Sequence, residues 1–122
     1  MAADHIELGR RGEDIAARYL TTRGAEVLVR NYRFSRAELD IVARTPAGLH
    51  FVEVKTRAYQ DLDAAAAAVA RRKQRNVMSA ASRYMDDHDY DGPFQFDIVV
   101  VLLGPAGTSR VQWRRDAFGF YT

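Results

Sequence analysis

The sequence contains no cysteine, and that absence excludes disulfides, thiolate zinc sites and cysteine nucleophiles. Long apolar runs are also missing. No stretch of about 18 apolar residues occurs, as a membrane-spanning helix would need, and no basic segment followed by an apolar run suggests a leader. We therefore expect a cytoplasmic protein with neither a membrane span nor a signal peptide. Histidine is scarce, and His5, His50 and His88 have no histidine partner one helical turn away, so a histidine metal site is not expected.

Lysine is nearly absent among the cations. Of the 18 cationic residues, only Lys55 and Lys73 are lysines, and the rest are arginines. A coding bias toward GC-rich triplets would explain this richness in arginine. Under such a bias, the two lysines mark positions where a compact point charge serves better than a rigid guanidinium. The formal net charge is only +2, so the total charge alone gives no case for wholesale phosphate binding.

The chain of 122 residues suits a single domain, which we expect to span residues 1–122. Hydrophobic periodicity and turn signals predict a helix, three strands, a second helix and two more strands. The segment 31–36 is polar and turn-like. The predicted helices cover Asp4–Thr22 and a segment from Asp61 or Asp63 to about Asp87; the predicted strands cover 27–29 (running to Asn31), 38–43, 49–57, 96–103 inside the sheet, and 110–115 at its edge.

The strand at 51–57 carries charges inside an apolar stretch. Successive side chains alternate between the two faces of a strand, so Glu53, Lys55 and Arg57 share one face. Charged groups are rarely buried without partners. A short turn joins this strand to the preceding one as an antiparallel hairpin, which lets Asp40 approach Glu53 and Lys55. The alternative is a half-exposed edge strand with a solvated face of ion pairs.

Other charges lie at the margins of the predicted helices. Glu13 borders the apolar stripe of the first helix, where it is either a solvated carboxylate or an acid that reaches toward a site beside the helix. Lys73 falls inside the apolar stripe of the second helix, so it either extends to water or points at an acidic site. The remaining cations on the helices belong either to solvated faces or to a phosphate-binding surface; they are Arg10, Arg11, Arg71, Arg72 and Arg75.

The grouping of Asp40, Glu53 and Lys55 suits phosphodiester hydrolysis. Two carboxylates and a main-chain carbonyl, here that of Val54, form a hard oxygen site for Mg²⁺ or Mn²⁺. Such an ion lowers the pKa of a bound water and polarises the phosphoryl oxygen. Lys55 would orient the attacking water or stabilise the charge that develops on phosphorus. Without a metal, the same residues could form a structural ion cluster, which is the alternative interpretation.

The arrangement Asp40…Glu53-x-Lys55 follows the Asp…Glu-x-Lys pattern of the restriction-endonuclease-like nucleases. Over nearly its whole length, the chain also resembles the YraN-like family of bacterial proteins. The motifs that carry this resemblance are Gly9-x-x-Gly12-Glu13-x-x-Ala16-x-x-Tyr19-Leu20, Gly24, Asn31-x-Arg33, Glu38-Leu39-Asp40, Phe51-Val52-Glu53-Val54-Lys55-Thr56-Arg57, Lys73 and Phe96-Asp97.

The resemblance implies an α/β, restriction-endonuclease-like fold, similar to that of archaeal Holliday junction resolvases. Its mixed central sheet of about five strands would be flanked by helices in the order α-β-β-β-α-β-β. The resemblance also implies metal ligands at Asp40 and Glu53, a catalytic Lys55 and an accessory Glu13. Two residues depart from the expected pattern: Ala37 stands where we expect a glycine, and Gln95 stands where we expect an arginine.

These observations favour a metal-dependent endonuclease that hydrolyses DNA phosphodiester bonds, and the resolvases suggest branched or damaged DNA as its substrate. Analogy with the resolvases also suggests a homodimer. One alternative is a nucleic-acid-binding module that keeps the fold without turnover. Another is a small interaction protein in which the charges form a structural cluster. The cations expected to contact phosphates are Arg10, Arg11, Arg57, Arg71, Arg72, Lys73 and Arg75.

Overall fold

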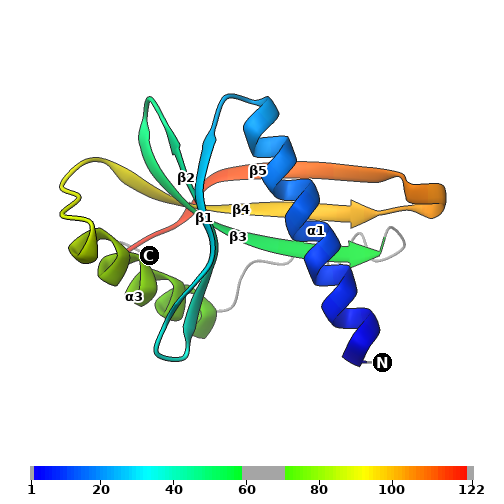
Figure 1. The fold of residues 1–122 in the computed structure, drawn as a ribbon, viewed down its shortest axis with the longest axis horizontal. Coiled ribbons are helices and arrows are strands. Elements are labelled where there is room, and N and C mark those ends of the chain that lie inside the picture. The colour runs from blue at the N-terminus through cyan, green and yellow to red at the C-terminus, as the bar shows by residue number, and fades with distance from the viewer. Residues whose placement is uncertain (1, 59–70, 121–122) are drawn as a thin grey trace.

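The computed structural model describes residues 2–58 and 71–120, and the side chains of residues 7–58 and 71–120 (Figure 1). The order of helices and strands agrees with the order expected from the sequence. The elements are α1 (Ala2–Thr22), β1 (Glu26–Phe34), β2 (Ala37–Thr45), β3 (Gly48–Ala58), α3 (Arg71–Asp87), β4 (Phe94–Leu103), the short 3₁₀ helix η2 (Pro105–Gly107) and β5 (Ser109–Phe118).

The five strands form one mixed sheet in the order β1-β2-β3-β4-β5. Neighbouring strands are antiparallel except for β3 and β4, which run parallel. Parallel neighbours require a long crossover connection, and α3 lies within that connection. The expected mixed sheet flanked by helices is therefore confirmed, as are the hairpin of β2 and β3, the interior position of β4 and the edge position of β5.

The prediction of a turn over residues 31–36 was wrong for most of that segment. β1 continues to Phe34, and Tyr32 and Phe34 pack against the core beneath α3. Asn31 sits inside the strand with a φ of 56°, a left-handed conformation that asparagine tolerates better than most residues. The polar residues around Tyr32 and Phe34 led to the prediction of a turn, although these two aromatic residues alternate as in a strand. The predicted start of the second helix at Asp61 or Asp63 lies outside the described residues.

Two apolar layers cover the two faces of the sheet, one beneath α1 and the other beneath α3. On one face, Ala16 and Leu20 of α1 pack over Val52, Val99 and Val101. On the other face, α3 buries Val77, Ala80, Ala81 and Tyr84 against Leu39, Phe51, Phe96 and Phe118. β4 lies between both layers, which explains its nearly continuous apolar sequence.

The contact between α1 and β3 depends on a glycine. A Cβ atom on Gly12 would lie 1.8 Å from Thr56 Oγ1 and 2.8 Å from Thr56 Cβ, which is fixed by the backbone of β3. Gly9, one turn earlier on α1, has no heavy atom within 4 Å of its hypothetical Cβ. Only Gly12 therefore has to remain a glycine for the helix to approach the strand this closely.

We expect Gly12→Ala to lower the free energy of unfolding by about 1–3 kcal/mol, because the new methyl group forces α1 and β3 apart. Gly9→Ala is the matched control. It should leave stability unchanged or raise it by up to about 1 kcal/mol, since alanine favours the helix. Urea denaturation followed by circular dichroism measures both variants. Equal stability of the two variants would contradict the packing argument.

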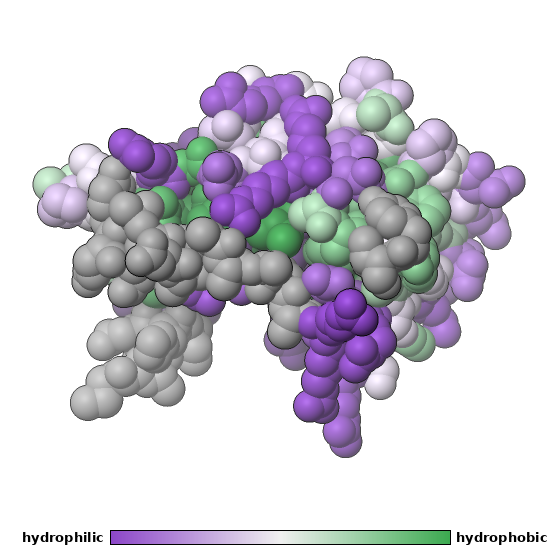
Figure 2. Space-filling model, turned by 180° about the vertical axis from the view of Figure 1, so that it is seen from behind, coloured by the Kyte–Doolittle hydropathy of each residue, from purple (hydrophilic) through white to green (hydrophobic). Residues whose placement is uncertain are grey.

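The hairpin of β1 and β2 extends away from the rest of the sheet (Figure 1). Seen from behind, its end is a hydrophilic projection at the lower edge of the molecule (Figure 2). Arg33, Ser35 and Arg36 are exposed there, and Arg33 Nε lies 3.3 Å from Glu38 Oε2.

Among the described residues, no helix is both long and apolar enough to cross a membrane.

Candidate active site

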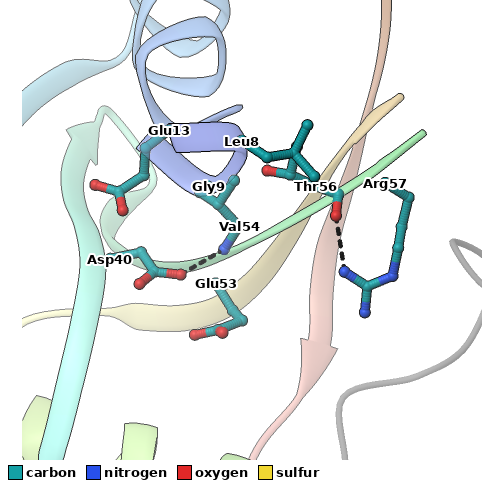
Figure 3. Close-up of a pocket in the computed structure, with 8 residues that line it drawn as sticks. All are labelled: Leu8, Gly9, Glu13, Asp40, Glu53, Val54, Thr56 and Arg57. Carbon is teal, nitrogen blue, oxygen red and sulfur yellow. Dashed lines mark hydrogen bonds between the residues drawn. The ribbon is translucent and has the colours of Figure 1, made fainter. Parts of the chain in front are cut away.

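The ladder between β2 and β3 ends at the pair Ile41–Val52. Asp40 and Glu53 are the next residues, at the point where the paired register stops. The backbone N–H of Val54 donates a hydrogen bond of 2.9 Å to Asp40 Oδ2, so a side chain replaces the strand partner that β3 loses (Figure 3). The sequence prediction that the hairpin would bring Asp40 to Glu53 is consistent with this geometry.

A cavity of about 310 Å³ opens beside the two acids (Figure 3). Helix α1 forms one wall, and the diverging strands β2 and β3 form the other. Three of its lining residues, Leu8, Gly9 and Thr56, were not predicted as site residues. Gly9 and Thr56 belong to the motifs that carry the family resemblance, whereas Leu8 does not. The lining residues are Leu8, Gly9, Glu13, Asp40, Glu53, Val54, Thr56 and Arg57.

Burial raises the pKa values of both acids, Asp40 and Glu53. Glu53 is only 7% exposed, and burial, followed by the charge of Asp40, raises the pKa of Glu53 to about 8. Burial also raises the pKa of Asp40, against the lowering effect of the Val54 hydrogen bond. Glu53 Oε2 is buried and accepts no hydrogen bond within the described part of the chain. A buried carboxylate beside a half-buried one attracts a proton or a cation.

Glu13 joins the site from α1, and its carboxylate points toward Asp40 (Figure 3). Burial and then the charge of Asp40 raise the pKa of Glu13. Arg30 of β1 opposes this shift, with its Nη2 atom 3.5 Å from Glu13 Oε1 and 2.8 Å from Asp14 Oδ1. Arg30 was not predicted as part of the site, because nothing in the sequence indicates that β1 brings it beside α1.

The two lysines differ in their position relative to the acid pair. Lys73 Nζ of α3 lies 3.5 Å from Glu53 Oε1, so the lysine in the apolar stripe does point at an acidic site. Lys55 is half-buried and is not among the lining residues of the cavity, all of which lie in the described part of the chain. Burial and the nearby Arg57 lower the pKa of Lys55, with Glu53 opposing them. The catalytic role of Lys55 therefore stays a prediction.

The predicted phosphate-binding arginines lie at different distances from the acids. Arg57 lines the cavity, and its Nη1 donates a hydrogen bond of 2.7 Å to the carbonyl oxygen of Thr56 (Figure 3). The others are exposed on the surfaces of the two helices, where their contacts with phosphates stay predictions: Arg10 and Arg11 on α1, and Arg71, Arg72 and Arg75 on α3.

Sequence comparison places this chain in a family. Residues 12–101 match the family described as "Uncharacterised protein family UPF0102". The chain belongs to this family. A UPF0102 protein of Frankia alni is 42% identical over 112 residues, which is 91% of this chain and 93% of that protein. A UPF0102 protein of Porphyromonas gingivalis is 40% identical over 117 residues, covering 95% and 87% of the two chains. The resemblance to the YraN-like family is thereby confirmed.

The acid pair of this UPF0102 protein has donors that fit a hard divalent cation. Among the side chains of residues 7–58 and 71–120, no three histidine, cysteine or acidic groups converge in a metal-binding arrangement. Mg²⁺, however, commonly binds through one or two carboxylates and keeps several waters. The unpartnered Oε2 of Glu53 supports such a site. Asp40, Glu53 and the main-chain carbonyl of Val54 are the groups that would hold the ion.

A second buried polar cluster in this UPF0102 protein surrounds Asp97 of β4. Its carboxylate accepts hydrogen bonds of 2.8–2.9 Å from His50 Nδ1, Trp113 Nε1, Gln95 Nε2 and the Asp116 N–H. Gln95, which departs from the expected family pattern, thus supplies one of the four donors. None of these groups lines the acidic cavity, and the network ties β3, β4 and β5 together.

Proposed function

We propose that this UPF0102 protein is a metal-dependent endonuclease that hydrolyses phosphodiester bonds in DNA. The observation that carries the proposal is that Asp40 and Glu53 lie beside one cavity. Glu53 is buried there with a raised pKa, and its Oε2 atom has no hydrogen-bond partner among the described residues. Arg57 lines the same cavity, and Lys73 approaches it from α3. Oxygen donors for a metal and cations for a phosphate are the combination that phosphodiester hydrolysis requires.

The residues would divide the work as follows. Asp40, Glu53 and the Val54 carbonyl would bind Mg²⁺ or Mn²⁺, which when bound lowers the pKa of a water and polarises the phosphoryl oxygen. The Val54 N–H fixes the Asp40 carboxylate through Oδ2. Glu13, with its raised pKa, is suited to exchange a proton beside Asp40.

The cations would hold the nucleic acid. Arg57 at the cavity, together with Lys55, would stabilise negative charge on the reacting phosphate or orient the attacking water. The exposed arginines of α1 and α3 would contact phosphates farther along the strand. By analogy with the resolvases, the substrate would be branched or damaged DNA and the protein a homodimer.

A cleavage assay tests the proposal. The purified protein is incubated with Mg²⁺ or Mn²⁺ and with junction, flap, supercoiled and single-stranded DNA, and EDTA provides the metal-free control. We expect cleavage that requires both the metal and Asp40, so that Asp40→Asn is inactive. Asp86→Asn, which changes an exposed carboxylate on α3, should retain activity. The absence of Asp40-dependent cleavage on every substrate would contradict the proposal.

DNA-binding measurements test the alternative of a binding module without turnover. The exposed arginines of α1 and α3 are the groups that would bind DNA in such a module. It requires DNA binding that weakens with salt and survives both Asp40→Ala and Glu53→Ala, without cleavage by the wild-type protein. Binding with a negligible dependence on salt would count against it.

A further inference from the structure

The ion pair between Lys73 and Glu53 joins two unequal partners. The Glu53 side chain is 9% exposed, whereas the Lys73 side chain is 47% exposed. The carboxylate is therefore fixed in the protein interior, while the ammonium stands at the end of a long side chain with access to water. The charge of Lys73 also acts on Asp40, so this one cation faces both acids.

A divalent cation at the acid pair would compete with this ammonium. Lys73 Nζ lies 3.5 Å from Glu53 Oε1, on the same carboxylate that would hold the ion. Like charges this close repel strongly in a partly buried site. Lys73 is free to move because lysine is flexible and its side chain is half-exposed, so the ammonium can return to water. Glu53 has no comparable freedom.

We infer that Lys73 is a built-in counter-ion that a divalent metal must displace from Glu53. This inference rests on the proposed metal site. Lys73 then stabilises the metal-free acid pair and lowers the affinity for the metal, because the two cations bind the same carboxylate at each other's expense. Once displaced, the ammonium becomes available to a phosphate. The metal would thus release a phosphate contact that the metal-free protein keeps occupied.

Titration calorimetry with Mn²⁺ alone tests the inference. We expect Lys73→Met to bind Mn²⁺ about 5- to 10-fold more tightly than the wild-type protein, at the low end of coupling between sites. Lys73→Gln, a second way to remove the charge, should behave in the same way. Lys73→Arg keeps the charge and should stay close to wild type. Arg75→Met removes an exposed cation from the same helix and should change the affinity less than about twofold.

The outcomes separate the inference from the proposed function. Equal Mn²⁺ affinity in the wild type, Lys73→Met and Lys73→Gln would overturn the inference and leave the metal site standing. An equal gain in Arg75→Met would also overturn it, because the effect would then come from net charge. If neither the wild type nor any variant binds Mn²⁺, the proposed metal site and the inference fail together. Circular dichroism confirms that each variant is folded.

Discussion

Glu53→Gln is expected to reduce metal-dependent cleavage by about 10²–10³-fold, the usual cost of removing one electrostatic contact in an active site. The same substitution should make the metal-free protein more stable. Glutamine has nearly the shape of the protonated acid but carries no charge to repel Asp40. A residue that lowers the stability of the metal-free protein, and is needed only to bind a ligand, is expected at a functional site.

The gain in stability should depend on pH, and its sign follows from the raised pKa of Glu53. In the unfolded chain this carboxyl loses its proton near 4.5, whereas in the folded protein its pKa is raised to about 8. Between these values the folded state holds a proton that the unfolded state has lost, so stability falls as the pH rises. We expect the free energy of unfolding of Glu53→Gln to exceed that of the wild type by on the order of 4 kcal/mol near pH 8 and by about 1 kcal/mol near pH 5.

Urea denaturation of the metal-free proteins at several pH values measures this difference, and the cleavage assay measures the loss of activity. Glu26→Gln is the matched control, since Glu26 is an exposed carboxylate on β1 that pairs with Arg44. That variant should keep its activity and show no gain that grows with pH. A Glu53→Gln protein that is less stable than wild type near pH 8 would contradict the account of the acid pair.

The alternation of β3 could be predicted because strand geometry leaves no choice. Side chains two residues apart share a face, so Val52 and Val54 lie toward α1 while Phe51 lies toward α3. The meeting of Asp40 and Glu53 followed from the short turn of the hairpin, which fixes the register. The end of the ladder at Ile41–Val52 did not follow, because nothing local in the sequence indicates where paired strands diverge.

Contacts that depend on the docking of helices could be predicted only in part, because the sequence left Lys73 either in water or at an acidic site. The prediction gave Lys55 the catalytic role through its spacing from Glu53, whereas the lysine within 4 Å of that carboxylate is Lys73, brought by α3. The ion pair of Arg30 with Glu13 likewise needs α1 and β1 to be adjacent. Hydrophobic stripes show which face of a helix is buried but not where along the sheet it docks.

The Asp97 network was missed for a similar reason. His50 has no partner nearby in the sequence, and its ring meets Asp97 only through the parallel register of β3 and β4. Parallel neighbours are joined by a long crossover, so their register cannot be counted from a short turn. The structural role of this lone histidine could be seen only in the assembled sheet.

Asp97→Ala is expected to destabilise the protein by roughly 3–5 kcal/mol, the largest loss among the substitutions considered. Four donors converge on the carboxylate, which is fully buried. Each buried donor left without a partner costs about 1–3 kcal/mol, and the donor on the buried His50 has the least access to water. Circular dichroism in urea measures the loss. Asp91→Ala, at an exposed aspartate just before β4, should change stability little.

The two acid clusters should respond to pH in opposite directions. The hydrogen bonds of Asp97 outweigh its burial and lower its pKa below the ordinary value of 3.8. Its contribution to stability is therefore complete above about pH 4 and is lost as the pH falls through the folded pKa. Glu53 weakens the protein toward pH 8, so wild-type stability should peak between the two limits. We expect Asp97→Ala to flatten the acid limb of this profile and Glu53→Gln to flatten the alkaline limb. If Asp97→Ala loses stability on acidification as steeply as wild type, the network is not the acid-sensitive element of the fold.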